Sequence, residues 1–159
     1  MSNPAYLWLV DENGSPVVGN SLVSGRLGAI ELRSVNHNVN IPTDQHTGRL
    51  TGTRVHSPIT LQKEFDKTTP LLYRALCQGA TFQSATIKMY QITEAGNEVE
   101  YFNIILENVK VVAITPNLYP GGQTGTHFEN LQLRYESITW KCCDGNILYK
   151  DTWNNRPVA

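Results

Sequence analysis

The sequence predicts an all-β protein, a barrel or sandwich of strands capped by one short helix. Apolar and polar residues alternate with a period of two along most of the chain, which is typical of half-buried strands. Only residues 68–79 have the spacing and end signals of a helix. With 159 residues, of which 40% are hydrophobic, the chain is large enough for one core rather than two. We therefore expect a single domain over 1–159.

Three strands are predicted in the first half of the chain. "AYLWLV" (5–10) is a short apolar run. "GAIELRSVNHNVNI" (28–41) changes its apolar phase midway, which predicts a bulge or a sharp bend. "SPITLQKEFD" (57–66) places apolar residues on one side, among them Phe65, and Lys63 interrupts that side.

The second half of the chain predicts a long hairpin followed by a shorter one. "ATFQSATIKMYQIT" (80–93) and "EVEYFNIILENVKVVAIT" (98–115) are joined by the turn "EAGN". The latter is too long for a flat strand, so a bend is expected at Glu107–Asn108. "ENLQLRYESITW" (129–140) and "NILYKDTW" (146–153) follow, with "CDGN" as the turn between them.

The predicted helix is "TTPLLYRALCQG" (68–79). Thr69 is expected to be its N-cap, Pro70 its first helical residue and Gly79 its C-terminal stop. Cys77 falls on or beside the apolar face, where a buried and inert thiol is expected.

No motif for catalysis, metal binding or a cofactor is found. His37, His46 and His56 lack the close pairwise spacing of metal ligands. "GRLTGTR" lacks the Gly-Lys-Ser/Thr sequence and the helix that a phosphate loop requires. No Gly-x-Ser-x-Gly is present, and the adjacent Cys142 and Cys143 would point to opposite faces of a strand. We expect a protein that is not an enzyme, with no metal and no cofactor.

Charge and the length of the apolar runs argue against nucleic acid and membrane as partners, and the cysteine count indicates the compartment of folding. The formal net charge is -1, with Lys and Arg spread along the chain, so nucleic acid is not an expected partner. The apolar run Ala5–Val10 is too short for a membrane span and lacks the features of a signal peptide. Three cysteines, an odd number, favour reduced thiols and folding in the cytoplasm.

Two long polar loops stand out. "PTDQHTGRLTGT" (42–53) has only Leu50 as a strongly apolar residue, whereas connections in compact domains usually have about four to six residues. Folded back on itself, this segment would reach roughly 20 Å from the body of the protein. A second loop, "NLYPGGQTGTH" (117–127), is rich in glycine.

The sequence resembles the haemolysin-coregulated protein (Hcp) family, the tube protein of the bacterial type VI secretion system. The resemblance is carried by "NPAYLWLVDENG", "IPTDQHTGRLTGTRVHSPITLQKEFDKTTPLLYRAL", "EVEYFNIILENVKVV" and "LRYESITWKCCDGNILYKDTW". Thr69 stands where relatives commonly have serine. The resemblance implies a two-sheet β-barrel with one helix and a long extended loop, related to phage tail-tube proteins. It also implies homohexameric rings that stack into a tube inside a contractile sheath.

The resemblance further implies roles for two groups of residues. The polar loop would contact the next ring or the neighbouring subunit. Its residues are Ile41, Pro42, Thr43, Asp44, Gln45, His46, Thr47, Gly48, Arg49, Leu50, Thr51, Gly52 and Thr53. A small polar face on the preceding strand would line the lumen of the ring, or else be an ordinary solvent face. That face consists of Ser34, Asn36, Asn38 and Asn40.

The expected partners follow from the same resemblance. They are further copies of the chain, a VgrG-type spike, sheath and baseplate proteins, and effectors carried or chaperoned in the lumen. Assembly in the cytoplasm would precede secretion to the extracellular space or a target cell without a signal peptide. Because the chain ends just past Trp153, no C-terminal effector extension is expected. Two alternatives stay open: a monomeric ligand-binding β-barrel, and an adaptor that binds a partner through the long loop.

Overall fold

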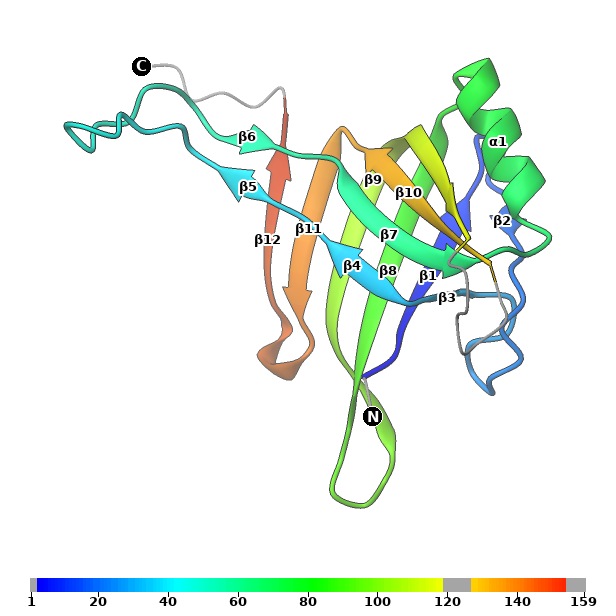
Figure 1. Cartoon of the computed structure of the whole chain (residues 1–159). Helices are drawn as coiled ribbons and strands as arrows, with labels where there is room; N and C mark the ends of the chain where they lie inside the picture. Colours follow the sequence, from blue (N-terminus) through cyan, green and yellow to red (C-terminus); the bar gives the residue numbers. More distant parts are fainter. Residues whose placement is uncertain (1–2, 119–126, 154–159) are drawn as a thin grey trace.

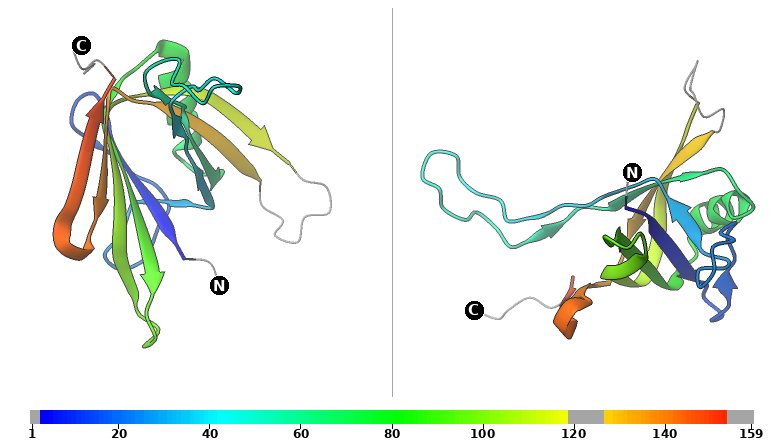
Figure 2. Two further views of the ribbon diagram at one scale, coloured as in Figure 1. Left: turned by 90° about the vertical axis from the view of Figure 1, so that its left-hand side faces the viewer. Right: turned by 90° about the horizontal axis from the view of Figure 1, so that it is seen from below.

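The computed structural model describes residues 3–118 and 127–153, which form two β-layers packed face to face with one helix beside them (Figures 1 and 2). One layer, sheet A, contains β1 (Ala5–Val10), β2 (Pro16–Val17), β3 (Ile30–Leu32), β8 (Phe82–Ile92), the first part of β9 (Glu98–Asn117), β11 (Ser137–Cys142) and β12 (Ile147–Thr152). The other, sheet B, contains the last part of β9, β10 (Phe128–Arg134), β7 (Ile59–Glu64) and β4 (Ser34–Asn36).

The long strand β9 belongs to both layers because it bends in the middle. Its residues up to Glu107 pair with β11, and those from Lys110 onward pair with β10. Between them, Asn108 has a φ of 52°, in the left-handed region that asparagine tolerates better than most residues. The bend predicted at Glu107–Asn108 is therefore confirmed.

The segment from β3 to β4 joins the two layers at their other side. β3 pairs with β1 of sheet A, whereas β4 pairs with β7 of sheet B. Only Arg33 separates them, and its backbone N–H donates to Gln62 O of β7 at 2.7 Å. This change of partner explains the change of phase in the sequence. The order β1-β8-β9-β10-β7-β4/β3-β1 returns to its start and confirms the predicted two-sheet β-barrel.

The core lies between the two layers and is almost wholly aliphatic. Alternate residues of β1, β7, β8 and β10 point into it, as the period of two predicts. Its fully buried side chains include Leu7, Leu9, Ile30, Ile59, Leu61, Leu72, Ile87, Leu106, Leu131, Leu133 and Ile138. Burying a Leu or Ile side chain stabilises the fold by about 1.5–3 kcal/mol, so this contact between the layers holds the barrel together.

Strand β7 corrects one expectation. Lys63 continues the inward series of Ile59 and Leu61 and is fully buried, whereas Phe65 lies beyond the strand end and is exposed. Lys63 can point inward because Glu129 and Asp66 pair with its ammonium group. Periodicity places both Lys63 and Phe65 on the inward side, but β7 ends at Glu64, and Lys63 takes the last inward position because its charge is paired.

The helix α1 spans Thr69–Gln78 and packs beside the barrel through Leu72, which is fully buried. Gly79 ends it as predicted, with a φ of 67°. The N-cap, however, is Thr68 rather than Thr69, so Pro70 is the second helical residue instead of the first. Thr68 makes no side-chain capping hydrogen bond, and the Thr69 hydroxyl donates to Glu129. Cys77 is exposed, so the expectation of a buried thiol is wrong. Cys77 comes two residues after the buried Ala75. Because each helical residue turns by about 100°, its side chain points some 200° away from that of Ala75, towards the opposite side of the helix.

The remaining elements follow the predicted order. The hairpin of β8 and β9 turns at residues 93–97, and the short 3-10 helix η1 (Asp144–Asn146) turns the chain between β11 and β12. Most of the glycine-rich loop 117–127 lies outside the described residues. In the described part of the chain, no helix has the length and hydrophobicity of a membrane span.

Candidate functional site: an extended arm and its base

The polar loop of the sequence is an arm that projects away from the barrel (Figures 1 and 2). We call residues 39–56 the arm. At its base, β5 (Val39–Asn40) pairs with β6 (Val55–His56) in an antiparallel ribbon. Farther out, Thr51 N donates to Pro42 O at 2.9 Å, next to an isolated bridge between Thr43 and Leu50. The arm is therefore paired as a two-stranded ribbon at its base and again near its tip.

The tip of the arm is a turn organised by one aspartate. Asp44 Oδ1 accepts hydrogen bonds from the backbone N–H groups of His46 and Thr47, at 2.7 and 3.1 Å. Asp44 N also donates to Arg49 O at 2.8 Å. Gly48 has a φ of 72°, which a glycine adopts without strain. The sequence "DQHTGR" thus closes the ribbon through local contacts.

The arm is polar, with a few exposed apolar side chains. All thirteen predicted loop residues, Ile41–Thr53, lie on it and are exposed or half-buried. Leu50 is 67% exposed, Ile41 45% and Val55 44%. This apolar surface is scattered rather than continuous, which suits a contact of moderate strength.

The base of the arm is fixed by a chain of hydrogen-bonded side chains. His37 Nε2 lies 2.9 Å from the Tyr135 hydroxyl, which lies 2.6 Å from Nδ1 of the buried His56. His56 Nε2 lies 2.7 Å from Asp151 Oδ2, and Arg54 Nε donates to the same oxygen at 2.5 Å. We call these five residues the base cluster. It links the arm to β12 and to the residue after β10.

Aromatic rings and charges complete the base cluster. Trp140 stacks on His56 with an interplanar angle of 17°, and the Trp153 ring lies 5.3 Å from it, centroid to centroid. Hydrogen bonding from Arg54 holds the pKa of Asp151 below its ordinary value of 3.8. Burial, followed by the nearby His56, lowers the pKa of His37, and burial raises the pKa of Tyr135.

The sequence reveals only part of this cluster. It singles out His37 and His56, but Tyr135 and Asp151 lie about eighty to a hundred residues farther along the chain and carry no local signal. No group of three or more His, Cys, Asp or Glu residues able to hold a metal ion occurs in the part of the chain that the structure describes.

A second feature is the outward face of sheet B, which is polar but uncharged at its centre. One cross-strand row consists of Ser34, Gln62, Asn130 and Thr115, and the next of Asn36, Thr60, Gln132 and Ala113. Of the four predicted lumen residues, Ser34 and Asn36 therefore lie on this face. Asn38 and Asn40 lie beyond it, towards and on the arm, and all four are exposed.

Sheet B also has two open edges. Within the described residues, no strand pairs with the outer side of β4, and none pairs with the outer side of β9 from Val111 to Asn117. These edges lie on opposite sides of the uncharged face. Open edges with free N–H and C=O groups can pair with another chain.

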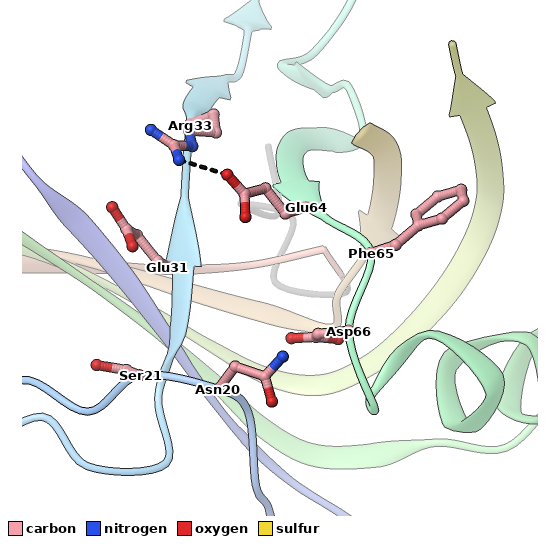
Figure 3. Close-up of a pocket in the computed structure, with 7 residues that line it drawn as sticks. All are labelled: Asn20, Ser21, Glu31, Arg33, Glu64, Phe65 and Asp66. Carbon is pink, nitrogen blue, oxygen red and sulfur yellow. Dashed lines mark hydrogen bonds and ion pairs between the residues drawn. The ribbon is translucent and has the colours of Figure 1, made fainter. Parts of the chain in front are cut away.

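A hollow between β3, the end of β7 and Asn20–Ser21 is charged (Figure 3). It has a volume of about 170 Å³. Arg33 pairs with Glu64 there, and Asp66 accepts a hydrogen bond from Lys63 at 3.0 Å. The charges are thus largely engaged with one another rather than arranged as a free acid and base.

Comparison with known proteins places the chain in one family. Residues 6–142 match the family model described as "Type VI secretion system effector, Hcp". The chain is 31% identical to the major exported protein of Pseudomonas aeruginosa, with 100% of this chain and 99% of the relative covered.

Solved structures agree with the family model. The Hcp1 protein of the E. coli EAEC 042 pathovar is 47% identical, with a TM-score of 0.88 over 96% of this chain and 99% of that one. The secreted protein Hcp3 of Pseudomonas aeruginosa is 25% identical, with a TM-score of 0.77 over 97% and 100% of the two chains. The chain therefore belongs to the Hcp family of type VI secretion system proteins.

Proposed function

We propose that this chain is the tube subunit of a type VI secretion system, that six copies form a ring, and that rings stack into the expelled tube. The observation that carries the proposal is sheet B, with an uncharged polar face between two open edges. Neighbouring strands in the order β9-β10-β7-β4 are all antiparallel, so β4 of one copy runs antiparallel to β9 of the next. The same ladder can then continue from copy to copy.

Such a contact joins two different surfaces and therefore closes into a ring when the rotation between copies allows it. The number six comes from the family. In this ring the face that contains Ser34 and Asn36 lines the lumen. Its small uncharged groups hydrogen-bond to water, and they form no ion pairs with a protein carried inside. We propose that effectors travel in this lumen and are protected there.

The arm serves in this proposal as the contact between rings. Its turn is ordered by its own hydrogen bonds, so it loses little conformational entropy on contact. Its few exposed apolar residues provide moderate affinity. Stacking within a contractile sheath on a VgrG-type spike and baseplate, followed by export with the tube, completes the proposed role.

The mass of the purified protein in solution tests this proposal. Light scattering after size exclusion should give six times the chain mass of 17.8 kDa, and negative-stain images of the same peak should show rings with a central hole. A monomer at every concentration would contradict the ring and favour the ligand-binding barrel or the adaptor.

A further inference from the structure

We infer that the base cluster is an acid-sensitive latch for the arm. It holds the arm to the barrel while at most one of His37 and His56 is charged, and it releases the arm when both are charged. The contacts of the latch lie within one chain, between the arm with its entry segment and Tyr135 and Asp151 of the barrel. The latch thus adds a regulatory role to the tube function proposed above.

His37 lies where the chain leaves the barrel for the arm, between β4 and β5. Its side chain is half-buried, with ring centroids 6.4 Å from His56 and 6.5 Å from Trp140. Beside it, Ser57 N donates to Asn38 O at 2.9 Å and closes the base of the ribbon. A change at His37 therefore acts where both strands of the arm meet the barrel.

The hydrogen bonds restrict where protons can lie in the cluster. A carboxylate only accepts, so His56 Nε2 must carry a proton to bond Asp151. The Tyr135 hydroxyl has one hydrogen and lies between two ring nitrogens, 2.6 Å from that of His56 and 2.9 Å from that of His37. It can donate to one ring while its oxygen accepts from the other. Either direction satisfies every bond, provided that at most one of the two histidines is charged.

A second charge breaks this chain of hydrogen bonds. When both rings are protonated, both nitrogens are donors towards the Tyr135 oxygen, and the Tyr135 hydrogen has no acceptor left between them. The two cationic rings also repel each other at a centroid separation of 6.4 Å. Because Tyr135 and His56 are buried, water cannot readily replace the lost bond. Double protonation thus weakens the attachment of the arm.

The surroundings of His37 offer little negative charge to compensate. The titratable and charged side chains around it, directly or through Trp140, are Arg54 and His56 of β6, Arg134 of β10, Tyr135, and Tyr149 and Asp151 of β12. Asp151 is the one carboxylate in this set, and Arg54 and His56 already contact it. A proton added to His37 therefore enters a site where cations outnumber anions.

The pKa of His37 sets the direction of the pH dependence. Burial, followed by the charge of His56, lowers this pKa from its ordinary value of 6.5, although the backbone of Ser57 opposes the change in part. The neutral form is thus favoured in the folded state, so its stabilising effect is complete above the ordinary value. It is lost as the pH falls through the lower folded pKa. The latch is closed at neutral pH and opens in a mildly acidic medium.

One consequence for the tube rests on the proposed function. If the arm joins successive rings, release of its base leaves that contact without a rigid support. Stacked rings would then separate more readily in an acidic medium than in a neutral one.

Hydrogen exchange of the full-length protein tests the latch. Exchange is followed by mass spectrometry at about pH 7.5 and about pH 5.5, and each protection factor is taken relative to the intrinsic exchange rate at the same pH. Protection of peptides within residues 38–57 should fall at least about threefold at the lower pH. His37→Gln should show a change of less than about 1.5-fold, because its amide can donate or accept but takes up no proton.

Two further variants separate the latch from other effects of acid. His46→Gln removes an exposed histidine at the tip of the arm and should keep the loss of protection seen in the parent. His37→Lys, which is charged at both pH values, should have low protection of residues 38–57 even at the higher pH. Peptides from β8 should keep their protection in every variant, and circular dichroism checks that each variant folds.

The outcomes decide between the latch and its alternatives. Unchanged protection in the parent would overturn the latch, and so would an equal loss in His37→Gln. A loss that disappears in His46→Gln, or that extends equally to β8, would overturn it as well. Light scattering of the same samples keeps the ring separate: monomers at both pH values would contradict the proposed ring, while a loss of protection confined to residues 38–57 would still support the latch.

Discussion

Asp151 is the residue on which the base cluster depends, because one of its oxygens contacts both Arg54 and His56. Asp151→Asn should lower the free energy of unfolding at pH 7 by about 2–4 kcal/mol, since two charge-assisted hydrogen bonds in a mostly buried position are lost. Urea unfolding of both proteins measures this difference. The exposed pair of Glu107 and Lys150 gives the control, and Glu107→Gln should cost less than about 1 kcal/mol.

The pKa of Asp151 also fixes how this difference depends on pH. The folded state holds the pKa below the ordinary 3.8, so the charged carboxylate stabilises the fold at any pH above that ordinary value. The stabilisation is lost as the pH falls through the lower folded pKa. The gap between Asp151→Asn and the parent should therefore shrink between pH 5 and the most acidic pH at which both fold. A gap that stays constant would contradict this role.

Single residues also show where sequence reasoning stops. Local signals correctly place Gly79 at the end of α1 and the bend at Asn108. Each depends on the backbone preference of a single residue, because glycine and asparagine both tolerate a positive φ. His56 was identifiable only as a histidine beside a polar loop. Its partners Tyr135 and Asp151 are distant in the chain, and no periodicity connects them.

At the scale of elements, a buried ion pair joins β7, β10 and the start of α1. The ammonium group of Lys63 pairs with Glu129, and both side chains are fully buried. The Thr69 hydroxyl donates to Glu129 Oε1 at 2.9 Å. The Thr69 hydroxyl, which the sequence predicts to cap the helix, thus contacts a strand instead. The strands themselves were predictable, since each forms from its own alternation.

Lys63→Met alone should cost about 3–5 kcal/mol, because it leaves Glu129 charged and buried without its partner. Adding Glu129→Leu should recover at least half of that loss, since an apolar pair replaces Lys63 and Glu129 and the remaining Asp66 carboxylate keeps its hydrogen bonds from Thr68. Guanidinium unfolding of the parent, both single variants and the double variant gives the four free energies of unfolding for a double-mutant cycle. Arg33→Met, which breaks the exposed pair with Glu64, is the matched control and should cost at most about 1 kcal/mol. Additive losses from the two single variants would contradict the coupling.

At the scale of the whole molecule, the barrel and the arm differ in what makes them predictable. The barrel follows from residues that bury one another within the chain. The arm buries little of itself, so its role depends on surfaces of other copies that the chain alone does not contain. Length and polarity identify the arm, and the resemblance to the Hcp family supplies its proposed partner.

Deleting Thr43–Thr51 tests the arm as a unit. The deletion removes the tip and the bridge between Thr43 and Leu50 but leaves the pairing of β5 with β6 and the base cluster in place. Rings should therefore keep their hexameric mass in light scattering, while tubes and secretion from a sheath-forming cell are lost. Gln45→Ala, a single change at the exposed tip that keeps the backbone of the turn, should preserve both. If the deleted protein still forms tubes and is secreted, the rings stack through another surface, and the role proposed for the arm is wrong.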